Sequence, residues 1–193
     1  MAQIAAGSLL PLEVYARERD AYRSRVIAHK KLRTVHAGEH VTLIFEDETT
    51  IRYQVQEMLR IERIFEAEGI RGELEAYNPL IPDGGNWKAT MLIEYPDEAE
   101  RRRRLAELKG VEARTWVEVE GCARVFAIAD EDMERENEEK TSAVHFLRFE
   151  LAPPMRAAMK GGAGLAVGVD HPNYRASVQV DAAVRRALAA DLV

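Results

Sequence analysis

Residues 40–69, HVTLIFEDETTIRYQVQEMLRIERIFEAEG, decide how this chain folds. Residues 40–46 are rich in β-branched and aromatic side chains and are apolar on both faces, which is typical of a buried strand. An acidic turn follows. Over residues 50–68 the apolar side chains recur at helical spacing, and Gly69 is the expected stop signal. The stretch therefore predicts a strand that leads almost directly into an amphipathic helix.

The order of elements on either side of this stretch predicts the fold class. Helical patterns come early and last, whereas strand patterns cluster in the second half of the chain. Helices are expected at 12–33, 50–68, 70–77, 97–109 and 182–192, and strands at 40–46, 87–95, 115–120, 124–129, 142–151, 165–169 and 174–180. This order favours an α+β fold, a mostly antiparallel sheet with helices packed against it, in a single domain over residues 1–193. The strongly charged residues 130–140 are expected to form a loop.

Composition limits the classes of function. The 193 residues are 47 % hydrophobic and 31 % charged, which is enough apolar material for a core. The net charge of −6 argues against nucleic acid or an anionic membrane surface as the main partner. No apolar run approaches the roughly 20 residues that a membrane-spanning helix needs. The lone cysteine, Cys122, cannot hold an iron–sulfur cluster of the protein's own, and it favours a cytoplasmic location.

The most informative feature of the helix predicted over residues 50–68 is an acidic side chain on its apolar face. A helical projection places Glu62 in the middle of this face, and Glu66 follows one turn later. The apolar side chains of the face are Ile51, Val55, Met58 and Phe65, flanked by Leu59 and Ile61. A carboxylate there costs several kcal/mol unless something pairs with it. The pattern thus predicts a counterpart for Glu62.

Several counterparts are compatible with the sequence. An arginine is the simplest, and Arg33 and Arg148 each share an otherwise apolar face. A raised pKa that keeps the acid neutral is the second. A metal is the third, with Glu62 and Glu66 joined by His29 and His40 as ligands for iron, manganese or zinc. An exposed groove or a protein interface would remove the need for a counterpart.

The loop over residues 77–86 is a further site candidate. Pro79 and Pro82 stiffen it, and it carries polar side chains at Asn78, Asp83 and Asn86. Long ordered loops often have functional roles, because they place polar groups on a rigid scaffold.

Five segments resemble an uncharacterised bacterial family, domain of unknown function 3501. They are residues 26–31 (VIAHKK), 40–48 (HVTLIFEDE), 53–66 (YQVQEMLRIERIFE), 77–84 (YNPLIPDG) and 141–150 (TSAVHFLRFE). Members of this family are often encoded beside a rubrerythrin and a ferredoxin-like iron–sulfur protein. The resemblance therefore implies a place in anaerobic or peroxide-related redox metabolism.

Three hypotheses follow. The leading one is an accessory or binding protein of a rubrerythrin-linked redox or peroxide-stress system, possessing a small His/Glu metal site. The second is an enzyme that holds a small molecule between the second helix and the sheet, where the buried glutamate acts as general acid or base. The third is a structural interaction module, which predicts an exposed apolar patch.

Overall fold

The structure, a computed structural model, describes residues 3–129 and 141–193. These residues form an α+β fold of helices and two four-stranded sheets in which every neighbouring pair of strands is antiparallel. The fold class predicted from the order of elements is confirmed, but the strands divide between two sheets. The loop predicted over residues 130–140 lies outside the described residues.

The helices are α1 (Leu12–Lys31), α2 (Glu48–Glu62), α3 (Ala67–Tyr77), α4 (Glu98–Glu107), α5 (Pro153–Lys160) and α6 (Ala182–Ala190), with short 3-10 turns η1 (Ala6–Ser8), η2 (Asn78–Leu80) and η3 (Glu112–Arg114). The strands are β1 (Thr34–His36), β2 (Val41–Phe45), β3 (Asn86–Ile93), β4 (Thr115–Val119), β5 (Val125–Phe126), β6 (Val144–Glu150), β7 (Leu165–His171) and β8 (Tyr174–Gln179). Within the described part of the chain, no helix combines the length and the hydropathy that crossing a bilayer requires.

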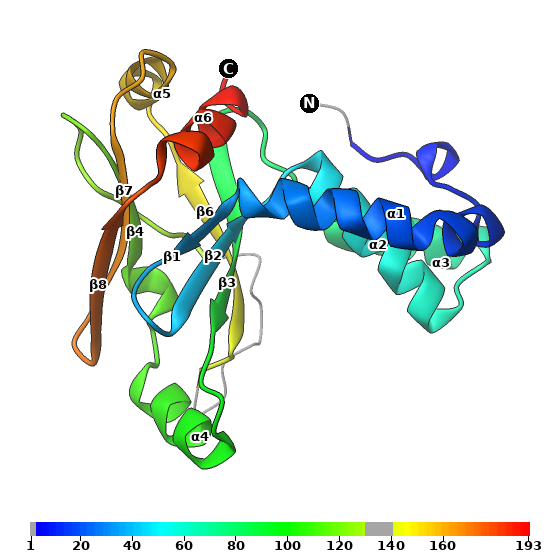
Figure 1. Cartoon of the computed structure of the whole chain (residues 1–193), viewed down its shortest axis with the longest axis horizontal. Coiled ribbons are helices and arrows are strands. Elements are labelled where there is room, and N and C mark those ends of the chain that lie inside the picture. The colour runs from blue at the N-terminus through cyan, green and yellow to red at the C-terminus, as the bar shows by residue number, and fades with distance from the viewer. Residues whose placement is uncertain (1–2, 130–140) are drawn as a thin grey trace.

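The two sheets share one hydrophobic core. The order β1-β2-β3-β6 makes up the first sheet and β5-β4-β7-β8 the second. Side chains alternate along each strand, so one face of the first sheet, including Phe45 and Met91, packs with Val117 and Val167 of the second. Figure 1 shows α5 and α6 at one end of the sheets and α4 at the other.

Helices α1, α2 and α3 pack together and project away from the sheets (Figure 1). We call them the helical arm. The arm has a core of its own, in which Ile51, Val55 and Leu59 of α2 pack with Leu74 of α3. The extent of the fold as a single domain over residues 1–193 stays a prediction.

Helix α2 ends six residues earlier than its apolar pattern predicts. Arg63 takes up the left-handed conformation, with φ of 55°, and closes the helix after Glu62. The next amide, that of Ile64, donates to the carbonyl of Leu59 at 2.9 Å, which satisfies a carbonyl at the helix end. A left-handed C-cap is usually glycine, so an arginine there gave no stop signal.

Gly69 has a different role from the one expected. It lies inside α3, where a Cβ atom would come within 2.6 Å of the side chain of Ile64. The glycine therefore allows α3 to approach the turn that follows α2. The predicted stop at Gly69 is wrong because the residue serves close packing and does not cap a helix.

Candidate functional site

The acidic residues singled out from the sequence are not buried. Glu62 and Glu66 are both exposed at the far end of α2. Since Arg63 ends the helix, the side chains beyond it do not continue the helical face, and Phe65 is 64 % exposed. Ile61 is 60 % exposed. The prediction that Glu62 points into the core is therefore wrong.

The arginines that were expected to pair with Glu62 have other partners. Arg33 forms an ion pair with Asp191, and Arg148 forms one with Glu150. Glu62 needs no such pair, because the residue is exposed.

The four predicted metal ligands do not form one site. His29 Nε2 lies 2.6 Å from Asp47 Oδ2, at the start of α2. Glu62 is the last residue of this helix, about 22 Å from Asp47 at a rise of 1.5 Å per residue, and Glu66 follows beyond the helix end. His40 precedes β2, and its Nδ1 lies 3.0 Å from the carbonyl oxygen of Glu94. Within the described residues, no group of three or more His, Cys, Asp or Glu side chains could hold a metal ion.

A buried carboxylate does exist, at the other end of α2. Glu46 is 7 % exposed and directly follows β2. Its amide donates to the carbonyl of Lys88 at 2.8 Å, so strand pairing continues and its side chain shares the outer face of the first sheet with Ile44 and Thr90. The hydroxyl of Thr90 donates to Oε1 of Glu46 at 2.6 Å, and that of Thr50 donates to Oε2. Each carboxylate oxygen therefore has one hydroxyl donor.

The start of α2 holds the second of these donors in place. Asp47 is the N-cap, and its carboxylate accepts from the Thr50 amide at 2.9 Å. The Asp47 amide in turn donates to the Thr50 hydroxyl at 2.9 Å. This capping box fixes the oxygen of Thr50 next to Glu46, and the carbonyl of Asp47 lies 3.1 Å from the same hydroxyl as a second acceptor. The positive end of the helix dipole also favours an anion at this position.

A cavity of about 270 Å³ lies between the helical arm and the outer face of the first sheet. Its apolar walls are Ile44, Ile51, Leu80, Leu92, Val144 and Phe146. Its polar side chains are Lys30, Glu46, Thr50, Gln54, Tyr77 and Thr90. The register of the sheet explains the wall, because Ile44, Thr90 and Phe146 form one row across β2, β3 and β6. The cavity thus combines an apolar wall with polar side chains, and one buried carboxylate faces it.

The carboxylate of Glu46 has no ion-pair partner in the part of the chain that the structure describes. Among residues 3–129 and 141–193, no Lys, Arg or His forms an ion pair with it within 4.0 Å. Lys30 lines the same cavity, and its Nζ lies 5.9 Å from the ring centroid of Tyr53. Hydrogen bonds to a charged group contribute about 1.5–3 kcal/mol each, whereas burial of an unpaired charge costs several kcal/mol. The two threonines therefore compensate for part of the burial of Glu46.

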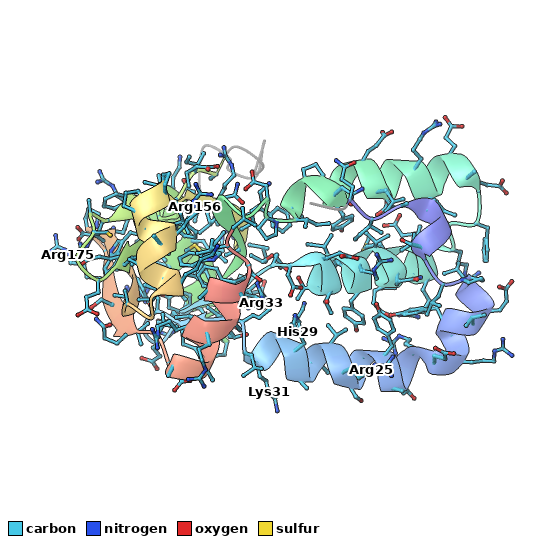
Figure 2. All side chains as sticks on the ribbon, turned by 90° about the horizontal axis from the view of Figure 1, so that it is seen from above. Arg25, His29, Lys31, Arg33, Arg156 and Arg175 are labelled. Carbon is cyan, nitrogen blue, oxygen red and sulfur yellow. The ribbon has the colours of Figure 1, made fainter. Side chains whose placement is uncertain are left out.

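Arg33 lies next to Glu46, but its guanidinium bonds to backbone carbonyl groups and not to the Glu46 carboxylate. Figure 2 shows it where the helical arm meets α6. Its Nε donates to the carbonyl of Phe45 at 2.8 Å, and its Nη2 donates to that of Glu46 at 3.2 Å. The same guanidinium pairs with Asp191, and with Asp47 at 3.4 Å. Burial raises the pKa of Asp191, and the charge of Arg33 partly opposes that rise. Arg33 thereby fixes the chain at the point from which the Glu46 side chain enters the cavity.

A family model described as Protein of unknown function (DUF3501) matches residues 3–192. The chain belongs to this family. The resemblance recognised from the sequence is thereby confirmed. The chain is similar to a crystal structure from Burkholderia pseudomallei K96243, described as a novel protein of unknown function, with 54 % identity over 100 % of both chains and a TM-score of 0.95. No curated protein matches the chain.

Sequence reasoning missed Glu46, although a signal was present. Glu46 closes a strand that is apolar on both faces, and a helix cap follows one position later. A residue in this position has no obvious solvent-facing side. The loop over residues 77–86 was considered as a site, and its Tyr77 and Leu80 do line the cavity. The site in this member of the family thus comes from the strand end and the loop, at the opposite end of α2 from Glu62.

Proposed function

We propose that this protein binds a small molecule in the cavity beside α2, and that Glu46 anchors it. The ligand would carry a cationic or hydrogen-bond-donating group, such as an ammonium, on an apolar body. The observation that supports this proposal is the buried carboxylate of Glu46, which two threonine hydroxyls hold facing the cavity and which has no positive partner among the described residues.

The physical argument is one of charge compensation. A cation brought by the ligand supplies the counterion that Glu46 lacks, and a charge-assisted hydrogen bond in an apolar cavity is stronger than a neutral one. The aliphatic and aromatic walls receive the rest of the ligand. At about 270 Å³ the cavity lies just below the range of roughly 300–1,000 Å³ that is usual for drug-sized ligands, so the ligand is small.

The same geometry supports an enzymatic role as the second candidate. A carboxylate fixed by Thr50 and Thr90 can accept a proton from a bound substrate and return it, which is general acid–base catalysis. The sequence predicted such a glutamate in a pocket between the second helix and the sheet. The residue that fits this description is Glu46 and not Glu62.

The role beside a rubrerythrin and a ferredoxin-like iron–sulfur protein stays a prediction from the family resemblance, as does a part in oxidative stress. The cytoplasmic location stays a prediction from the single cysteine. An iron, manganese or zinc site was suggested for such a role. Its four proposed ligands, Glu62, Glu66, His29 and His40, do not lie together. The cavity at Glu46 is compatible with an accessory function, since a bound small molecule can regulate the docking of a partner.

Thermal unfolding with three probes of one shape tests the proposal. Benzylamine, benzyl alcohol and benzoate differ in charge but share a ring of the same size. We expect benzylamine to raise the melting temperature most, because its ammonium group is the only positive charge among the three probes. A ligand at 100 times its Kd adds about 2.7 kcal/mol of stability. Glu46→Gln removes the charge with little change of shape and should abolish this preference.

Glu62→Gln is the matched control, because it makes the same substitution at an exposed site beyond the cavity. It should leave the preference for benzylamine intact. Equal responses of the wild type and Glu46→Gln, or the largest stabilisation by benzoate, would refute the proposed role of Glu46.

A further inference from the structure

The free end of the helical arm carries a second apolar depression, far from Glu46. It has a volume of about 310 Å³ and lies between the segment that precedes α1 and the turn that joins α2 to α3. Its lining includes Leu9, Leu12, Ile64, Phe65 and Ile70. We call this depression, together with Ile61, the arm tip.

The apolar side chains of the arm tip are unusually exposed. Phe65 is 64 % exposed and Ile61 is 60 % exposed, although both belong to residue types that normally enter a core. The left-handed Arg63 accounts for the exposure of Phe65, because it ends α2 before this residue. A concave apolar surface with an exposed aromatic side chain at its edge is typical of a protein-docking site.

The charges around the arm tip are mostly negative. Glu13 lines the depression. Glu62 at the end of α2, Glu66 in the turn and Glu68 at the start of α3 are exposed. The basic residues here are Arg63 in the turn and Arg71, which pairs with Glu68 at 3.7 Å. Burial raises the pKa of Glu73, and the nearby negative charge of Glu62 raises it further. These carboxylates disfavour an anionic membrane or a nucleic acid and favour a basic partner.

We propose that the arm tip docks a basic amphipathic helix of a partner protein. The apolar stripe of that helix would enter the depression against Phe65, and its lysines or arginines would face the carboxylates of Glu62 and Glu66. This mode is the helix-in-groove recognition that amphipathic partners use. The proposal is independent of the ligand at Glu46.

Fluorescence anisotropy with two designed peptides tests the proposal. Both peptides have about 18 residues, enough for five helical turns, with leucine on one face; one carries lysine and the other glutamate on the opposite face. We expect the lysine peptide to bind much more tightly than the glutamate peptide. Its affinity should fall as the salt concentration is raised.

Two variants locate the binding surface. Ile61→Ser combined with Phe65→Ser should weaken binding of the lysine peptide at least tenfold without changing the melting temperature, because both side chains are exposed. Glu62→Lys combined with Glu66→Lys should shift the preference toward the glutamate peptide. Ile27→Ser, at a 42 % exposed position of α1, is the matched control and should change nothing.

Three outcomes would overturn the proposal. The first is equal binding of the two peptides by the wild type. The second is unchanged binding by the serine double variant. The third is self-association of the free protein that Phe65→Ser abolishes in sedimentation experiments, because the arm tip would then be occupied by a second copy of this chain. None of these outcomes affects the benzylamine test at Glu46.

Discussion

The two ends of helix α2 place glutamates in similar sequence surroundings but in opposite environments. At the first end, Glu46 follows an apolar strand and is buried with two hydroxyl donors. At the other end, Glu62 lies among isoleucine and phenylalanine but is exposed. A carboxylate is buried where other elements supply donors to it, as β3 and the first turn of α2 do for Glu46. The apolar character of neighbours in the sequence does not decide its burial.

The difference also separates the two proposed roles. The first end is pre-organised, because a capping box and Arg33 fix the backbone around Glu46. The arm tip has exposed apolar side chains that a partner can cover. A small molecule suits the enclosed site, whereas a helix suits the open one.

The largest effect is expected for Arg33→Met at the first end of α2. The change leaves Asp191 and Asp47 without their shared cation and removes the donors to two carbonyl groups. Loss of one partner of a buried pair costs about 3–5 kcal/mol of unfolding free energy, which urea denaturation measures. Arg175→Met is the control, since its ion pair with Asp170 is exposed and should contribute less than about 1 kcal/mol. Similar losses in the two variants would contradict the role of Arg33.

An intermediate effect is expected for Glu57, midway along α2. Two hydrogen bonds from Arg19 at 2.8 Å, with help from the Tyr15 hydroxyl, lower the pKa of Glu57 from 4.5 to about 2. The folded state therefore holds this proton more weakly than the unfolded state. The stability that Glu57 contributes is full above about pH 4.5 and is lost as the pH falls toward 2.

Glu57→Gln should cost about 2 kcal/mol at neutral pH, because a hydrogen-bonded charge is lost. The stability of this variant should also fall less steeply than that of the wild type between pH 4.5 and about 2. Urea midpoints measured across this range check both expectations. Parallel pH profiles for the two proteins would exclude a role of the Glu57 carboxylate in acid unfolding.

The smallest effect is expected for Glu62→Ala at the arm tip. Because the side chain is exposed, the change should alter the unfolding free energy by less than about 0.5 kcal/mol. Had Glu62 belonged to a buried pair, the loss would have been about 3–5 kcal/mol. A urea midpoint close to that of the wild type confirms the exposed placement, and a loss above about 2 kcal/mol contradicts it.

Much of the fold was predictable because its signals are local. The hairpin of β7 and β8 follows from alternation around a turn, and Asp97 and Asp181 cap α4 and α6 as their side chains suggest. The division of the strands between two sheets was not predictable, because it depends on which distant strands pair. The position of Glu46 at the end of an apolar strand was a local signal of its burial, but its partner in the other strand was not predictable, for the same reason. Glu46 meets Thr90 through the register of β2 and β3, and no local pattern encodes that contact.

A crystal structure of the protein with benzylamine tests the central claim most directly. The account predicts the ammonium nitrogen within about 3 Å of a carboxylate oxygen of Glu46, with the ring against the apolar wall that Phe146 helps to form. Benzylamine bound at the exposed carboxylates of Glu62 and Glu66, with none of it beside Glu46, would contradict the account.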